Sequence, residues 1–162
     1  MQQPVIISLN FNGRCVEAFE RYAATLGSRI ESVVTYAGSA SAHKLPSDQT
    51  SRVKYAVLHL PDLTLIGWDS LPDQFHGRNS LSPLVLKVAD ACEAECLFMV
   101  LARHGSVIVP FGRHARGMRS GRVLDEFGML WVVTHAAPKA TQNGGGRALV
   151  RLDKSSEPTA TR

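Results

Sequence analysis

The chain of 162 residues has no long hydrophobic run, and its first residues, MQQPVIISLNFNG, have neither a basic start nor an extended apolar core. A helix that crosses a bilayer needs about 18 consecutive apolar residues, and a secretory signal peptide needs both of the missing features. We therefore expect no membrane partner and no signal peptide. The sequence also lacks a Gly-x-Ser-x-Gly motif, a P-loop and a Gly-x-Gly-x-x-Gly motif, and no Ser/His/Asp nucleophile arrangement is recognisable.

Cysteine is scarce, because the chain has three: Cys15, Cys92 and Cys96. An odd number cannot pair completely within one chain. Cys92 and Cys96 are one helical turn apart, but no third Cys or His lies nearby in the sequence to complete a closed metal site. Free cysteine packs as a small hydrophobic residue, so we expect all three to be buried in helices. This cysteine usage predicts a reducing compartment, the cytoplasm.

The net charge of +4 is unevenly distributed. Residues 1–138 carry 13 Lys and Arg against 12 Asp and Glu, whereas residues 139–162 carry five against two. No aromatic residues interleave with these charges and no nucleic-acid-binding motif accompanies them, so we expect no nucleic-acid partner. We predict one domain over 1–138 followed by a flexible basic tail over 139–162. Within the tail, ALVRL at 148–152 is a candidate docking strand.

The sequence repeats itself. Residues 5–18 (VIISLNFNGRCVEA) and 84–97 (LVLKVADACEAECL) both contain an apolar strand, a turn and the start of a helix. The later strands 62–66 and 128–132 also correspond. Internal duplication often determines an architecture, so we predict two βαβββ modules of an α+β fold.

Apolar periodicity predicts where the elements of each module lie. Helical spacing covers 15–26, with Gly27 as its stop, and 89–104, with Asp90 as a candidate N-cap and Gly105 as its stop. Strands are predicted at 4–11, 29–36, 53–60, 63–68, 81–88, 107–109, 118–124 and 129–134. The modules thus cover about 4–70 and 80–135.

Four segments in order resemble one known family. They are LNFNGRCVEAFERYAATLG (9–27), YAVLHLPDLTLIGWDSLP (55–72), SPLVLKVADACEAECLFMVLARHGSVIVPF (82–111) and GRVLDEFGMLWVV (121–133). Together they resemble the vicinal oxygen chelate superfamily, also called the glyoxalase/bleomycin-resistance/dioxygenase superfamily, and within it the PhnB-like branch. The resemblance implies two βαβββ modules that form a half-open, barrel-like mixed sheet around one pocket. It also implies a homodimer.

Metal-using members of this superfamily place His, Glu or Gln ligands on the first and last strand of each module. The resemblance puts the corresponding positions, to within one residue, near Ile7, Ile66, Pro83 or Leu84, and Val132. None is a metal ligand, and the neighbours Ser8, Gly67 and Val133 do not supply the set. We therefore predict no metal and no other cofactor, and we lean against catalysis. For a divergent metal site, the fallback ligands are His59 and His135, together with Asp69.

Two kinds of residue are candidates for ligand binding. Trp68 and Trp131 occupy comparable strands, where they line a cavity for a planar ligand or belong to the core. The segment 112–122 (GRHARGMRSGR) is basic; its arginines bind an anion or are solvated. Strand alternation places Arg119 and Arg122 on opposite faces. The candidate ligand-binding residues are Tyr55, Trp68, Arg116, Arg119, Arg122 and Trp131.

These observations predict a metal-free protein that sequesters or senses a small molecule, anionic or aromatic. Two alternatives stay open. One is a divergent metal-dependent lyase, isomerase or dioxygenase. The other is a structural or regulatory homodimer whose basic tail docks an acidic partner.

Overall fold

The computed structural model describes residues 5–39, 42–60, 63–72, 83–114, 117–135 and 149–152, the last as backbone. The first module forms a four-stranded sheet in the order β1-β4-β3-β2, with one helix. Its elements are β1 (Val5–Asn10), α1 (Cys15–Leu26), β2 (Arg29–Thr35), β3 (Val53–Leu60) and β4 (Leu63–Trp68). Two short 3-10 helices, η1 (Tyr36–Gly38) and η2 (Ala42–Lys44), lie between β2 and β3.

The second module repeats this topology, with strands in the order β6-β7-β8-β5. Its elements are β5 (Leu84–Val88), α2 (Ala91–Ala102), β6 (Ser106–Arg113), β7 (Arg119–Leu124) and β8 (Leu130–His135). In both modules the first strand runs parallel to the last, and the other neighbours are antiparallel. The α+β fold of two βαβββ modules is therefore confirmed.

A fifth strand extends the second sheet. β9 (Leu149–Leu152) pairs in parallel with β5, at the place where the run 148–152 suggested a docking strand. The remaining predictions for the tail 139–162 lie outside the described residues. No helix in the described part of the chain is both long and apolar enough to cross a membrane.

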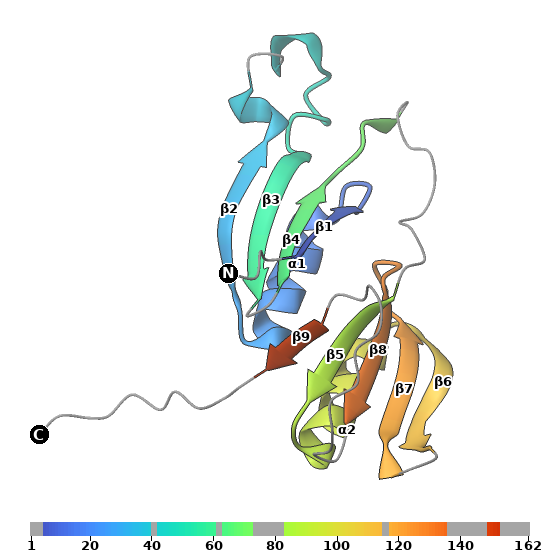
Figure 1. The fold of residues 1–162 in the computed structure, drawn as a ribbon. Helices are drawn as coiled ribbons and strands as arrows, with labels where there is room; N and C mark the ends of the chain where they lie inside the picture. The colour runs from blue at the N-terminus through green and yellow to red at the C-terminus, as the bar shows by residue number, and fades with distance from the viewer. Residues whose placement is uncertain are drawn as a thin grey trace, which may run out of the picture.

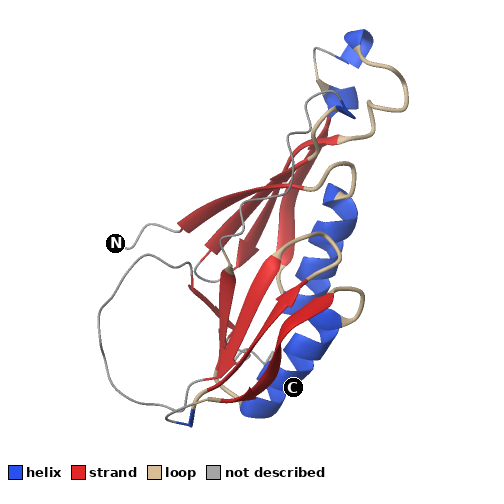
Figure 2. Cartoon of the chain, turned by 90° about the vertical axis from the view of Figure 1, so that its right-hand side faces the viewer, coloured by secondary structure: helices blue, strands red, loops and turns tan. Residues whose placement is uncertain are grey.

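Each sheet has one face covered by its helix. Figure 1 shows the two sheets one above the other, and Figure 2 shows α1 and α2 along the same side of both. The buried residues of the two modules form one hydrophobic cluster, which includes Phe19 and Tyr22 of α1 and Leu97 and Phe98 of α2. We call the opposite side of each sheet its helix-free face.

Local sequence signals explain where the helices begin and end. Gly27 closes α1 in the left-handed conformation, with a φ of 61°, which glycine adopts at little cost. Asp90 caps α2, because its side chain accepts a hydrogen bond from the backbone N–H of Glu93 at 2.8 Å. Gly105 has a different role from the predicted helix stop: a Cβ there would lie 2.2 Å from the carbonyl oxygen of Leu124. Close packing between the α2–β6 turn and β7 therefore requires glycine.

The expectation that all three cysteines are buried is wrong for two of them. Cys15 is buried, whereas Cys92 and Cys96 are exposed. The buried residues of α2 are Ala94, Leu97, Phe98 and Leu101. Positions 92 and 96 fall on the other side of a helix with 3.6 residues per turn, so the helical phase turns both thiols toward solvent.

Candidate functional site

Gly67 of β4 shows which face of the first sheet meets α1. A Cβ at this position would lie 2.5 Å from the ring of Phe19 and 2.8 Å from Sγ of Cys15. Because successive side chains of a strand point to opposite faces, Ile66 points to the helix-free face. Ser8 pairs with Ile66 in the parallel register of β1 and β4, so it shares that face.

Gly121 of β7 gives the same information for the second sheet. A Cβ there would lie 2.7 Å from the ring of Phe98 in α2, and Gly121 pairs with Val133 of β8. The next residue of β8, Val132, therefore lies on the helix-free face, together with Val85, its partner in β5. The two modules thus place equivalent residue pairs, Ser8 with Ile66 and Val85 with Val132, on their helix-free faces.

These pairs correspond, within one residue, to the positions that hold a metal in metal-using members of the resembled family. The strand pleat decides the remaining ambiguity: Ile7 and Leu84 face the helices, and Ser8 and Val85 face away from them. One hydroxyl and three aliphatic side chains do not fit a divalent metal ion, which takes imidazole or carboxylate ligands. Within the described residues, no group of three or more His, Cys, Asp or Glu side chains could hold a metal ion.

The fallback ligands lie apart and have other partners. The buried carboxylate of Asp69 accepts backbone N–H hydrogen bonds from Gly13 at 2.6 Å, Cys15 at 3.1 Å and Val53 at 2.9 Å. It therefore secures the loop before α1.

His59 lies toward the opposite end of β4, where its ring contacts Thr64 Oγ1 at 3.0 Å and the carboxylate of Glu31. Five strand positions, roughly 16 Å, separate Thr64 from Asp69. His135 is on the other sheet, with Nδ1 3.3 Å from the carbonyl of Val88.

Three of the six candidate ligand-binding residues share the helix-free faces. Tyr55 precedes the buried Ala56, which pairs with Gly67, so Tyr55 points away from α1 and is 44% exposed. Trp68 follows Gly67, points the same way and is half-buried. Arg122 follows Gly121 on the second sheet and is exposed.

Of the other three, two lie on the helix side and one lies outside the described residues. Trp131 is fully buried and pairs with Leu84 on the helix side, so it belongs to the core. Arg119 also faces the helix side, where it forms an ion pair with Glu95 of α2 at 3.2 Å and stacks 5.4 Å from the ring of Phe111. Arg116 lies outside the described residues.

A second exposed cation, Lys87, escaped the sequence analysis. Lys87 of β5 pairs with Thr134 and Arg122 of β7 pairs with Val132, so the two cations lie on either side of β8 on one face. The sequence could have indicated Lys87, because this lysine is the one charged residue in an apolar strand, LVLKV, whose other residues are buried. On this face, the described strand positions of the second sheet include no acidic residue.

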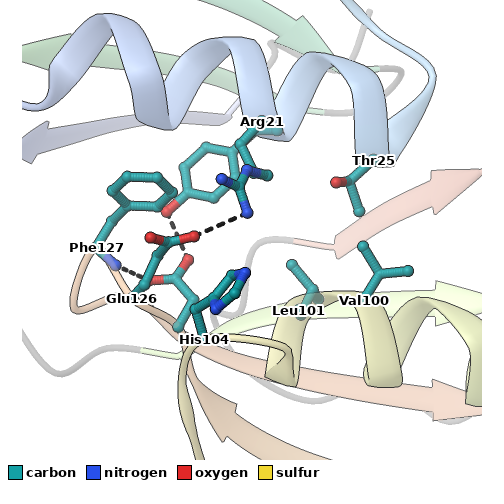
Figure 3. A pocket seen from close by; sticks show the side chains of 9 residues that line it. Arg21, Thr25, Val100, Leu101, His104, Glu126 and Phe127 are labelled. Carbon is teal, nitrogen blue, oxygen red and sulfur yellow. Dashed lines mark hydrogen bonds and ion pairs between the residues drawn. The ribbon is translucent and has the colours of Figure 1, made fainter.

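A separate small hollow lies between the modules, where α1, α2 and the β7–β8 turn meet (Figure 3). Asp125 is one of its lining residues, and its buried carboxylate accepts hydrogen bonds from Tyr22 Oη at 2.6 Å and Trp131 Nε1 at 2.7 Å. The same carboxylate accepts backbone N–H bonds from Phe127 and Met129 at 2.9 and 2.8 Å. Burial, together with the nearby charge of Asp125, raises the pKa of Tyr22 well above its usual value.

The residues around the hollow connect the two modules. Glu126 forms ion pairs at 2.9 Å with both Arg14 and Arg21 of the first module. The hollow has room for roughly one water molecule. We call this set, Tyr22, Asp125, Glu126 and Trp131, the inter-module clasp. Its contacts explain the Asp-x-Phe-Gly-x-x-Trp pattern of 125–131 as a structural motif.

The fold and its two helix-free faces define a protein of paired βαβββ modules, and solved structures share this architecture. The chain is similar to protein PA1353 from Pseudomonas aeruginosa, with a TM-score of 0.73 and 30% identity over 83% of this chain and 98% of that one. It is also similar to a PhnB protein from Bacillus cereus, with a TM-score of 0.70 and 22% identity over 83% and 100% of the two chains. A glyoxalase-related enzyme from Fulvimarina pelagi gives 0.54 and 18% over 84% and 89%.

A scan against family models and a search of curated proteins each found no match. The structural comparisons nevertheless establish the fold. The chain has the fold of the PhnB protein and of the glyoxalase-related enzyme, and with protein PA1353 it shares 30% of its sequence as well as the fold.

Proposed function

We propose that the chain binds a small molecule on its helix-free faces, to sequester or sense it, without a metal ion at the usual positions of the family. The observation that carries this proposal is the pairing of Ser8 with Ile66 and of Val85 with Val132. These four side chains supply one hydroxyl and no imidazole or carboxylate, so they favour binding over metal-assisted catalysis. The proposed location is the cytoplasm, where the free thiols of this chain stay reduced.

The side chains of the helix-free faces suggest the chemical class of the ligand. Tyr55 and Trp68 offer aromatic surfaces, which suit a planar or apolar body. Arg122 and Lys87 offer positive charge without an acidic neighbour on the described strand positions of that face. An amphipathic anion, with a carboxylate or phosphate attached to an apolar body, fits both features.

The same faces favour a homodimer. Ile6 of β1 pairs with Thr64, which places it on the helix-free face, and it is 60% exposed. Together with Tyr55 and the half-buried Ile66 and Trp68, it gives this sheet an apolar surface of a kind that often marks an interaction site. A second copy would cover part of this surface and enclose the ligand.

The test measures binding of 1-naphthoate, an aromatic carboxylate, by isothermal titration calorimetry on metal-free protein. Arg122→Gln should weaken binding at least about tenfold, since a charge-assisted hydrogen bond contributes about 1.5–3 kcal/mol. Trp68→Ala should weaken it similarly. Arg103→Gln is the matched control, because Arg103 is an exposed arginine at the end of α2.

Three outcomes would count against the proposal. The first is equal binding by the Arg122→Gln and Arg103→Gln variants. The second is equal affinity for 1-naphthoate and for the neutral 1-naphthalenemethanol. The third is stoichiometric metal in the purified protein, with binding lost after chelation; that result would favour the metal-dependent enzyme instead.

A further inference from the structure

We propose that Cys92, Cys96 and Met99, on the outer face of α2, form a binding site for a soft monovalent metal ion, Cu(I). This site is independent of the helix-free faces, because it lies on the opposite side of the molecule. It uses side chains that the proposed small-molecule binding does not.

Helix geometry places the three sulfur-containing side chains on one stripe of α2. Positions 92, 96 and 99 are related by i, i+4 and i+7, and at 100° per residue they fall within a stripe about 60° wide. Side chains four residues apart have Cβ atoms about 5–6 Å apart, a separation at which one metal ion can bridge two thiolates. All three side chains point to solvent: Cys92 and Cys96 are exposed, and Met99 is 64% exposed.

Such exposure is unusual for these residue types. Free Cys and Met are among the residues most often buried, and the chain has three Cys and four Met in all. Three of these sulfur-containing residues lie within eight positions on one exposed stripe. Neither the core nor the inter-module clasp accounts for them, because α2 packs through Ala94, Leu97, Phe98 and Leu101.

The donor set determines the metal class. Thiolate and thioether sulfur are soft ligands that select Cu(I) over the harder divalent ions. As two Cu–S bonds form, Cys92 and Cys96 release their thiol protons to solvent, the copper stays monovalent, and Met99 adds a neutral third ligand. The resulting centre carries one negative charge. Arg103 follows Met99 by one turn and is exposed, so its guanidinium can partly balance that charge.

The scaffold under the site is already formed. The Asp90 cap orders the first turn of α2, which carries Cys92, and the buried side of the helix is part of the main core. Metal binding therefore needs rotation of side chains but no folding of the backbone, which lowers the entropic cost of binding.

The test is an anaerobic titration of the full chain with Cu(I), supplied as its acetonitrile complex, in competition with bathocuproine disulfonate. We expect one Cu(I) per chain. Cys92→Ser and Cys96→Ser should each abolish competitive binding, and Met99→Leu should weaken it about tenfold. Met118→Leu is the matched control, because Met118 is also exposed, at 42%, but lies next to β7, and it should have no effect.

Further readouts make the proposal refutable. The thiol reagent DTNB should react quickly with two thiols of the native apo protein and with the third, buried Cys15 only after unfolding. Slow reaction of all three thiols would show that a second copy or another partner covers the stripe, and would overturn the proposal. So would one Cu(I) per two chains, or unchanged Cu(I) affinity in the double variant Cys92→Ser/Cys96→Ser. The substituted residues are exposed, so urea unfolding should confirm that every variant folds like the parent.

Discussion

At the scale of single residues, the buried side chain of Asp125 joins the two modules. Its two carboxylate oxygens accept four hydrogen bonds, two from side chains and two from backbone N–H groups. A buried carboxylate is costly unless its lone pairs are satisfied, and here each oxygen accepts two bonds. The residue thus joins α1 of the first module to β8 of the second.

We expect Asp125→Asn to destabilise the protein by about 3 kcal/mol, because the amide replaces one acceptor by a donor and leaves buried donors unsatisfied. Tyr22→Phe, which removes one hydrogen bond, should cost about 1–2 kcal/mol. Urea unfolding followed by circular dichroism measures both. Asp48→Asn, at an exposed loop position, is the control and should change stability by less than about 0.5 kcal/mol. Equal stability of the Asp125→Asn and Asp48→Asn variants would refute the role of Asp125.

Tyr22 should make the fold sensitive to alkaline pH. Burial raises its pKa in the folded state, whereas the unfolded side chain titrates near pH 10. The folded state therefore retains a proton that the unfolded state loses, and the free energy of unfolding should fall as the pH rises above 10. The difference between wild type and Tyr22→Phe should change by about 1.4 kcal/mol per pH unit.

Urea unfolding at several pH values between 8 and about 11.5 measures this difference. The buried Cys15 thiol, whose pKa burial also raises, acts in the same direction in both proteins and cancels in the comparison. Tyr55→Phe, at an exposed position, should keep the wild-type slope. Parallel curves for wild type and Tyr22→Phe would contradict the prediction.

At the scale of elements, the pleat of each strand decides which side chains can meet a ligand. Buried glycines mark the side that contacts a helix: Gly67 lies against Phe19, and Gly121 against Phe98. Strand alternation then assigns every neighbour to a face. The sequence predicted that Arg119 and Arg122 lie on opposite faces, and the β7 register bears this out. The sequence alone could not determine which of the two faces is the helix-free face.

Gly67→Ala tests the contact between β4 and α1. The added Cβ would lie 2.5 Å from Phe19, so either the helix or the ring must move, and we expect a loss of about 1–3 kcal/mol. Gly112→Ala in β6 is the matched control, because nothing lies within 4 Å of the added Cβ. Its effect should stay below about 0.5 kcal/mol. Chemical unfolding of the two variants side by side measures the difference, and equal effects would argue against this packing.

At the scale of the whole molecule, the chain is a duplicated unit whose copies have diverged. Among the described residues, each module has its helix on one face of the sheet and no helix on the other (Figure 2). Within the described part of the chain, the second sheet has an additional parallel strand, β9, beside β5, and the first sheet has no such strand. On the helix-free face of that module, two cations are exposed, Lys87 and Arg122. The described strand positions of this face include no acidic residue. The two halves therefore offer different chemistry, an aromatic surface and a basic one.

We expect the protein to sediment at twice its chain mass of 17.6 kDa, as a homodimer through the apolar part of the first helix-free face. Ile6→Lys should weaken the dimer at least about tenfold, because it places a charge where an exposed apolar side chain would be buried. Val16→Lys is the control, since Val16 is 38% exposed on α1. Analytical ultracentrifugation across a concentration series measures both. A wild-type monomer at every concentration would refute the expectation.

The sequence by itself determined the local and repeated features of this protein: two modules, the βαβββ order of elements along each, both helices, the Asp90 cap and the Gly27 stop. These follow from periodicities of 2 and 3.6 residues and from turn chemistry, which depend on near neighbours. The sequence also indicated, to within one residue, that the positions which bind a metal in the resembled family carry no metal-binding side chain here. The repeat made this possible, because it aligns the two modules.

The tertiary structure alone decided which faces these elements present. Trp68 and Trp131 look equivalent in sequence, yet one lies on the helix-free face and the other is fully buried against Asp125. The hydrogen bond between Tyr22 and Asp125 joins residues 103 positions apart, and no local sequence pattern predicts this contact. It depends on how the two modules pack, because only packing determines which strand face is buried and which helical stripe, such as that of Cys92 and Cys96, stays in solvent.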